Sequence, residues 1–138
     1  MFYGASSFNQ EDLSKWDTSS VTFMSLVFSQ ASAFDGNISF WNISAVTNIT
    51  GMFFRASSFN QEDLSTSASA VTTMRSMFHK ASAFNGNISS WNMSSVTDMN
   101  HMFYGASSFN QNLCSWKDNS FLLTTMQMES SWILAAHF

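Results

Sequence analysis

The histidines and the single cysteine are the residues whose types could carry catalysis or bind a metal ion. His79, His101 and His137 stand at different positions of a repeating pattern, and no carboxylate recurs with them at the spacing of metal ligands. No serine lies in a G-x-S-x-G context, so a nucleophile with its base and oxyanion hole is not indicated. Cys114 fills a position that serine takes in the other repeats, which indicates a serine-sized substitution rather than a reactive thiol. We therefore expect no metal, no cofactor and no enzymatic activity.

Aromatic and basic side chains that recur about once per repeat could instead form a binding surface. Aromatic and Arg side chains dominate the energetics of protein interfaces. If the repeats stack as strands do, neighbouring members of this set lie within about 5 Å of one another. Two interpretations remain open, an exposed binding surface or a column half-buried against the next coil. The candidate binding residues are Tyr3, Phe54, Arg55, His79, Lys80 and Tyr104.

Five N-x-[ST] sequences could become glycosylation sites, but only if the chain enters a eukaryotic secretory pathway. Four of them recur in pairs 50 residues apart, so internal duplication accounts for half of the set. The sequences begin at Asn37, Asn42, Asn48, Asn87 and Asn92.

Composition and charge exclude several classes of partner. Only 10% of the 138 residues are charged, the formal net charge is −4, and Lys and Arg form no cluster. This is the opposite of the basic surface on which nucleic-acid and anionic-membrane binding depend. No run of 18 apolar residues could span a bilayer, and the chain shows no signal peptide.

The sequence is built from about five copies of a unit of about 25 residues. Columns of apolar residues recur in register, which indicates a continuous core, and most methionines fall in these columns as core filler. The main columns are a first Phe (Phe2, Phe28, Phe53, Phe78, Phe103), an Ala (Ala5, Ala31, Ala56, Ala81, Ala106), a second Phe (Phe8, Phe34, Phe59, Phe84, Phe109), an aliphatic residue (Leu13, Ile38, Leu64, Ile88, Leu113), a Trp (Trp16, Trp41, Trp91, Trp116), a Val (Val21, Val46, Val71, Val96) and a Met or Ile (Met24, Ile49, Met74, Met99).

Units alternate between two types, so a doublet is the unit of copying. Units one and three share A-S-S-F-N-Q-E-D-L-S, whereas units two and four share A-S-A-F-[DN]-G-N-I-S. The extra residue at Glu11-Asp12 and Glu62-Asp63 predicts an outward bulge. The third unit has lost its Trp, which predicts an underfilled core at that coil.

A unit of this length cannot bury enough apolar surface to fold alone, so it must stack on its neighbours. The stretch F-N-x-x-[LI]-S-x-W alternates and is bounded by turn residues, which predicts a short strand. The stretch M-x-x-M-F-x-x-A-S-x-F has apolar spacings of three and four and predicts one helical or 3-10 turn.

Over roughly residues 1–118, the repeat M-F-x-x-A-x-x-F-N-Q-x-L-S-x-W-[DN]-x-S-x-V-T-x-M resembles the BspA-like leucine-rich-repeat surface proteins. The resemblance implies an α/β fold, a right-handed leucine-rich-repeat-like solenoid of about five coils, over residues 1–118. Residues 119–138 fit the pattern poorly and are expected to form a degenerate closing coil or an unstructured tail. The resemblance also implies a surface or extracellular protein that takes part in adhesion or protein recognition.

Two functional hypotheses follow. The first is a non-catalytic module that binds a protein or surface-glycan ligand, and the second is a structural spacer or cell-wall element. An ice-binding face is a remote third, because the Thr22, Thr47, Thr72 and Thr97 column is only one residue wide. Since Met1 occupies an internal repeat position, we expect a piece of a longer array whose uncapped first coil frays or self-associates end to end.

Overall fold

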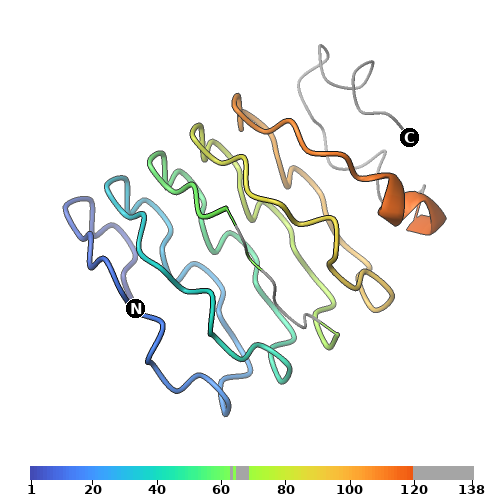
Figure 1. Cartoon of the computed structure of the whole chain (residues 1–138), viewed down its shortest axis with the longest axis horizontal. Helices are drawn as coiled ribbons and strands as arrows, with labels where there is room; N and C mark the ends of the chain where they lie inside the picture. Colours follow the sequence, from blue (N-terminus) through green and yellow to red (C-terminus); the bar gives the residue numbers. More distant parts are fainter. Residues whose placement is uncertain (63, 65–68, 120–138) are drawn as a thin grey trace.

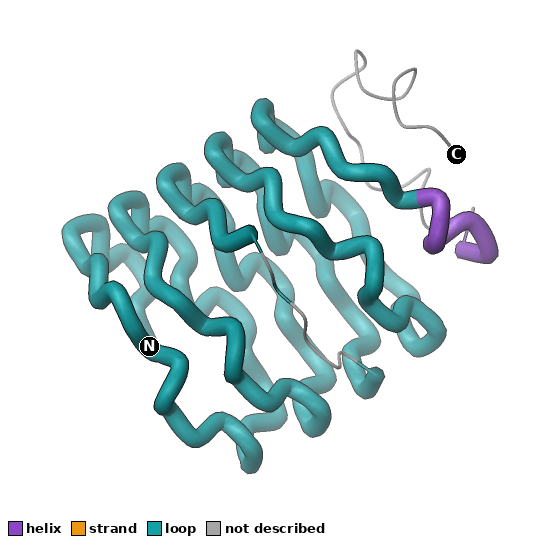
Figure 2. The backbone as a smooth tube through the Cα atoms, in the orientation of Figure 1, coloured by secondary structure: helices purple, strands orange, loops and turns teal. Residues whose placement is uncertain are grey.

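The chain winds into successive coils that lie side by side along one axis (Figures 1 and 2). The computed structural model describes residues 1–62, 64 and 69–119. Each coil takes up one repeat, so residues of the same column become neighbours in space. Isolated parallel bridges join these neighbours, namely Asp12 with Asn37, Phe23 with Asn48, Asn48 with Thr73, and Thr73 with Asp98. The coils therefore pair in parallel and in register, one repeat apart.

Turns and bends make up most of the described chain. Its one helix is the short 3-10 helix η1 (Cys114–Asn119), drawn in purple in Figure 2. Where the sequence predicts a strand in the first coil, the structure has the single bridge at Asp12. The other three bridges form a column that begins at Phe23, where the sequence pattern predicts no strand. Where one helical turn is predicted, separate turns occur, with bonds from the Ser29 N–H to the Leu26 carbonyl and from the Ala31 N–H to the Phe28 carbonyl.

Two columns of left-handed residues explain why no helix continues through the M-x-x-M-F stretch. A backbone with φ near +60° does not fit a right-handed helix, and it redirects the chain within one residue. The first column lies two residues before the first Phe column (Leu26, Gly51, Ser76, His101), and the second lies two residues after it (Gly4, Gln30, Arg55, Lys80, Gly105). The chain therefore turns twice around each buried Phe.

Backbone hydrogen bonds from coil to coil satisfy the donors that a helix or sheet would otherwise satisfy. The Phe28 N–H donates to the Met52 carbonyl at 2.9 Å. At another side of the coil, the Thr47 N–H donates to the Thr22 carbonyl at 2.9 Å, and the same bond recurs from Thr72 to Thr47. Each coil is thus fixed to both neighbours by a repeating set of main-chain bonds.

The two Phe columns form ladders of stacked rings through the centre of the coils. Within a coil, the paired rings have centroids 3.9 Å apart at Phe28 and Phe34. Between coils, the centroids of Phe28 and Phe53 are 5.7 Å apart, with nearly parallel planes. The small Ala column is buried beside these rings, with Ala31, Ala56 and Ala81 fully covered. Parallel stacking at these distances gives the core a repeating, densely packed spine.

The predicted core columns are buried from the second coil onward. Trp41, Trp91 and Trp116 are buried, whereas Trp16 in the first coil is 42% exposed. Phe8 and Val21, also in the first coil, are half-buried against the core. The indole N–H groups of two buried tryptophans donate to carbonyls of the preceding coil, Trp41 to Leu13 at 2.8 Å and Trp91 to Leu64 at 2.6 Å.

The two types of coil make different interfaces, which gives the doublet a physical reason. The Gln10 carbonyl oxygen lies so close to Gly36 that a Cβ at this glycine would overlap it, and Gln61 stands in the same relation to Gly86. At the other kind of interface, the Gln61 side-chain amide donates to the Asp35 carbonyl at 2.7 Å. At the predicted bulge, the side chains of Glu11 and Asp12 are exposed. The backbone there is nevertheless paired with the next coil, since the Asn37 N–H donates to the Glu11 carbonyl at 2.8 Å.

The predicted closing segment, residues 119–138, lies outside the described residues except for Asn119. His137 and the part of the third coil at residues 65–68, where the Trp is missing, also lie outside them.

Candidate functional site

Three rings from consecutive coils form a continuous stack beside the main core. The centroids of Phe54 and His79 are 4.7 Å apart, and those of His79 and Tyr104 are 5.0 Å apart. We call Phe54, His79 and Tyr104 the ring ladder. The His101 ring lies edge-on to the last two rings, at 6.4 Å from His79 and 6.2 Å from Tyr104. Because Phe54 and Tyr104 stack on either side of His79, the faces of the His79 ring are covered and only its edge is left for contact with solvent.

Main-chain bonds at the ladder keep the three coils in register. The Arg55 N–H donates to the His79 carbonyl, and the Lys80 N–H donates to the Tyr104 carbonyl, both at 2.7 Å. These bonds are among the shortest between coils, and each belongs to the residue directly after a ladder ring. The ring spacing therefore follows from the backbone and does not depend on side-chain packing alone.

The two cationic residues of the predicted site lie at the left-handed column. Arg55 and Lys80 have φ values of +57° and +56°, and both are exposed. The Arg55 guanidinium carbon lies 5.4 Å from the centroid of the Phe54 ring, which is the geometry of a cation–π contact. The same column holds Gly4 and Gly105, the residue type for which this backbone conformation carries no steric cost.

The structure brings five of the six predicted binding residues together and leaves Tyr3 apart. Tyr3 belongs to the same column, but Ser29 stands between it and Phe54 and is only 1% exposed. Tyr3 is 60% exposed, and its hydroxyl oxygen accepts a bond from the Gln30 amide at 3.0 Å. Tyr104 is also exposed, whereas Phe54 and His79 are half-buried between their neighbours. Some members of the column are therefore exposed and others are half-buried between coils, and the binding role stays a prediction.

The charged groups that act on His79 are all cationic. Burial lowers the pKa of His79 below its ordinary value of 6.5, and the nearby charges of Lys80, His101 and Arg55 lower this pKa further. The Nδ1 atom of His79 is buried and has no hydrogen-bond partner in the described part of the chain. At neutral pH the ladder is therefore uncharged and is flanked by two fixed positive charges.

With this geometry established, sequence comparison gives a family. The family described as "Mycoplasma protein of unknown function, DUF285" matches the chain twice, over residues 1–68 and 64–132. The chain belongs to the DUF285 family. Two consecutive matches also show that the DUF285 chain is a tandem repeat. No similar protein is found among the curated proteins or the solved structures that were compared.

The described residues of this DUF285 chain contain no cluster of metal-binding side chains. Within that part of the chain, no three His, Cys, Asp or Glu side chains come together as they would around a metal ion. Cys114 is partly buried at the start of η1, where its N–H donates to the Asn112 side chain at 2.8 Å. No helix among the described residues is long and apolar enough to cross a membrane.

The asparagines of all five predicted glycosylation sequences make the same local turn. In each one the side-chain oxygen accepts a bond from the N–H two residues later, at 2.9–3.1 Å. Asn42, Asn87 and Asn92 are exposed, whereas Asn37 and Asn48 are partly buried. Asn side chains stabilise bends in this way without any modification. Each asparagine therefore has a structural reason to be where it is.

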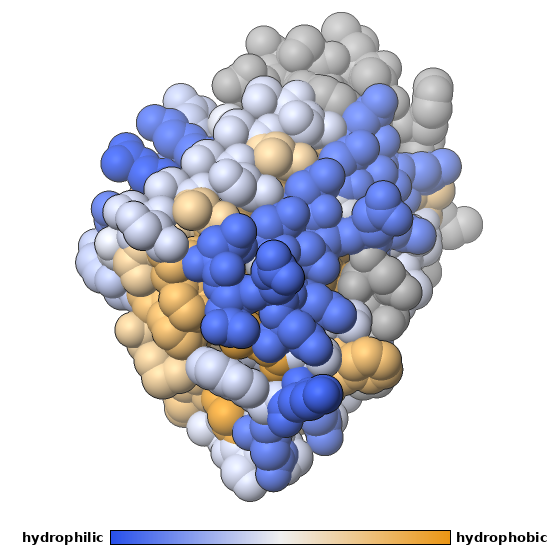
Figure 3. All heavy atoms as spheres, turned by 60° about the vertical axis from the view of Figure 1, so that its left-hand side comes forward, coloured by the Kyte–Doolittle hydropathy of each residue, from blue (hydrophilic) through white to orange (hydrophobic). Residues whose placement is uncertain are grey.

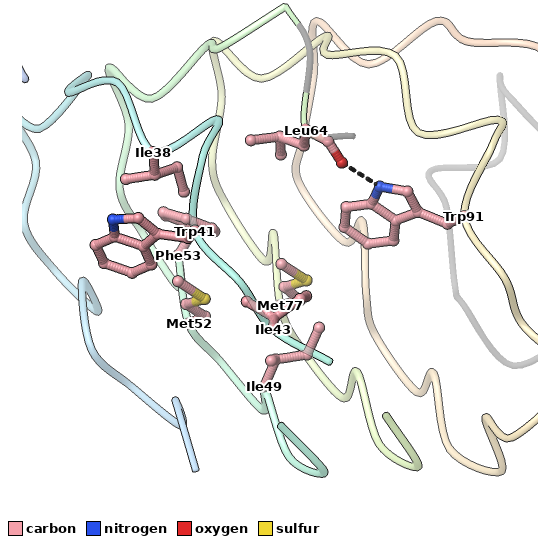
Figure 4. Close-up of a pocket in the computed structure, with 9 residues that line it drawn as sticks. All are labelled: Ile38, Trp41, Ile43, Ile49, Met52, Phe53, Leu64, Met77 and Trp91. Carbon is pink, nitrogen blue, oxygen red and sulfur yellow. Dashed lines mark hydrogen bonds between the residues drawn. The ribbon is translucent and has the colours of Figure 1, made fainter. Parts of the chain in front are cut away.

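A small apolar cavity lies in the core between Trp41 and Trp91, beside Leu64 (Figure 4). Its volume is about 20 Å³, which is room for about one water molecule, and its lining side chains are all apolar. The missing Trp of the third coil predicts an underfilled core, and the cavity lies between the two coils that keep their Trp. At this size the cavity is a packing defect rather than a ligand site.

A polar groove of about 400 Å³ was not anticipated from the sequence. It follows the Asn column, in which the Asn85 N–H donates to the Asn60 side chain and the Asn110 N–H donates to the Asn85 side chain. The repeated Asn column was the signal available in the sequence, but turn formation accounts for it equally well. The lining residues are Asn60, Glu62, Asn85, Asn87 and Gln111.

Apolar surface is also exposed at the first coils. Figure 3 views the molecule with this end turned forward and shows apolar patches beside a broad hydrophilic band. Most of the large apolar side chains that are exposed come from the first two coils, namely Met1, Tyr3, Trp16, Phe23, Leu26 and Phe40. The expected end-to-end self-association stays a prediction.

Proposed function

We propose that this chain is a non-catalytic recognition module that binds a protein partner through the ring ladder and its flanking cations. We also propose that its stacked coils are the right-handed leucine-rich-repeat-like solenoid of the BspA-like surface proteins, and that it acts at the cell surface in adhesion. The parallel, in-register pairing of the coils supports this fold assignment.

The observation that carries the proposal is the partly exposed, pre-ordered stack of Phe54, His79 and Tyr104 with Arg55 against its first ring. Aromatic and Arg side chains supply most binding energy at interfaces, and rigid rings lose little conformational entropy when they bind. The ladder rings are held by main-chain bonds at their own coils. The loss of conformational entropy when these side chains bind a partner therefore reduces the favourable free energy of binding only slightly.

The test uses Tyr104→Ala and Phe54→Ala, with Phe40→Ala as the matched control. Phe40 is an exposed aromatic residue that no other ring contacts among the described residues. We expect each ladder variant to lower stability by no more than about 1 kcal/mol. The intact chain would be immobilised and exposed to surface proteins from the source cells, and the retained partner would be purified and its affinity measured by surface plasmon resonance.

The ladder variants should weaken this affinity about tenfold or more, the scale of an interface hot spot, while Phe40→Ala leaves it unchanged. Equal affinities for all variants would refute the ladder as the binding surface, and failure of the immobilised chain to retain any partner would favour the structural spacer. A loss of several kcal/mol in the unfolding free energy of Tyr104→Ala would show instead that the ladder belongs to the core.

A further inference from the structure

Arg55 and Lys80, which flank the ring ladder, lie at positions where the backbone conformation favours glycine. The left-handed column begins and ends with Gly4 and Gly105, whereas Gln30, Arg55 and Lys80 hold the same conformation between them. A non-glycine residue in this region costs about 1–2 kcal/mol. Gln30 has the same conformation in a coil without a ladder ring, so the strain alone does not mark the site; what it does is place each cation directly after a ladder ring.

Arg55 and Lys80 form no ion pair with any carboxylate among the described residues. Burial lowers the pKa of His79, and the nearby charges of Lys80 and Arg55 lower it further. The carboxylate of Asp98 lies 3.9 Å from Arg75, so its charge is offset by that guanidinium. A chain with a net charge of −4 therefore carries a locally positive surface at this site.

The exposed edge of the His79 ring also favours a negatively charged ligand. Both faces of His79 are covered, one by Phe54 and the other by Tyr104. Ring edges carry positive partial charge, whereas ring faces carry negative partial charge. A sugar that needs a free ring face finds none at His79, but a carboxylate or carbonyl oxygen can approach the edges.

We propose that the ladder with Arg55 and Lys80 binds an acidic peptide segment of the partner. The inference rests on the proposed function, because it names the chemical class that the same surface recognises. The guanidinium of Arg55 offers a planar fork that pairs with one carboxylate, and the ammonium of Lys80 binds a second, one coil further along. An apolar or aromatic side chain of the peptide packs against the exposed Tyr104 ring.

The experiment measures binding of the intact chain to soluble polymers by fluorescence anisotropy. The peptide probes are a random copolymer of glutamate and tyrosine and plain polyglutamate, and polygalacturonate is the anionic polysaccharide probe. The test variant is Arg55→Gln/Lys80→Gln. Lys15→Gln/Arg75→Gln is the matched control, because it removes the same charge at residues outside the ladder.

We expect the copolymer to bind best, its affinity to fall as salt is added, and the test variant to lose about tenfold or more. The control should change by no more than about twofold, since exposed or paired cations contribute little. The inference is overturned if the test variant binds the copolymer as well as the original chain does, if polygalacturonate binds more tightly than the peptides, or if neither peptide binds.

The two proposals fail in different ways. If Tyr104→Ala abolishes binding of the purified partner while Arg55→Gln/Lys80→Gln does not, the recognition function stands and the acidic ligand is wrong. Thermal unfolding of every variant, followed by circular dichroism, separates lost binding from lost structure.

Discussion

Replacing Gly86 with alanine tests how tightly the two types of coil fit together. A Cβ at this position would overlap the backbone carbonyl oxygen of Gln61 in the preceding coil. A carbonyl fixed in the backbone cannot rotate aside as the end of a side chain can. The two coils would therefore have to move apart locally.

The loss in unfolding free energy can be worked out from the hydrogen bonds that this movement of the coils would disturb. The Asn87 N–H donates to the Glu62 carbonyl at 2.9 Å, and the Asn85 N–H donates to the Asn60 side chain at 2.8 Å. Each such bond contributes about 0.5–1.5 kcal/mol net, and overpacking in a well-packed region costs about 1–3 kcal/mol. We expect Gly86→Ala to lower the free energy of unfolding by about 2–5 kcal/mol.

Gly4→Ala is the matched control. Gly4 has φ +70° and no atom within 4 Å of an added Cβ, so it reports backbone strain without overlap. That strain costs about 1–2 kcal/mol and is partly offset by the smaller entropy of the unfolded chain. Urea unfolding followed by tryptophan fluorescence would compare the two variants. A Gly86→Ala variant no less stable than Gly4→Ala would refute the close fit between coils.

Three further predictions concern single side chains. Trp41→Phe should lower the free energy of unfolding in urea by about 1 kcal/mol more than Trp116→Phe does. The reason is that the Trp41 indole donates to the Leu13 carbonyl, whereas the Trp116 Nε1 has no acceptor in the described chain. Equal losses of unfolding free energy in the two variants would contradict this. The pKa of His79 in the folded chain lies below its ordinary value of 6.5, so between these two pKa values the unfolded chain binds more protons than the folded chain. The contribution of His79 to the free energy of unfolding is therefore complete above pH 6.5 and is lost as the pH falls through the lowered pKa. Thermal melts across that range should show a smaller pH dependence for His79→Phe, and an identical pH dependence would rule out the assigned pKa shift. Lys80→Gly should raise stability by about 0.5 kcal/mol by relieving left-handed strain while weakening binding of the acidic copolymer, and a less stable variant would show that no strain is stored there.

The core could be predicted well from the sequence because the same apolar residue types recur at the buried position of each repeat. A column that repeats Phe, Ala, Leu or Trp at one spacing indicates an inward position, and the residues of these columns are buried from the second coil onward. The first coil is the exception, because Trp16 is exposed and Phe8 and Val21 are only partly buried. Trp16 nevertheless has a ring neighbour. It packs against Trp41 of the second coil, with centroids 6.4 Å apart.

The candidate surface was only partly predictable, since a shared column does not fix exposure. Tyr3 and Phe54 occupy the same position of the repeat, yet the buried Ser29 of the intervening coil separates them. The left-handed backbone at Arg55 and Lys80 was not predicted, because neither residue type favours it. The role of Gly36 and Gly86 also escaped prediction, since it depends on a carbonyl contributed by another coil.

The alternating interfaces restrict how an array of this kind can change its length. Removing one coil would place a second Gln-bearing coil directly on the first, so the Cβ of Gln61 would stand where Gly36 now leaves room for the Gln10 carbonyl. Removing two coils restores the original contact. Recombination between repeats should therefore survive selection mainly when it adds or deletes coils in pairs, and a survey of natural variants should find copy number inherited in even steps.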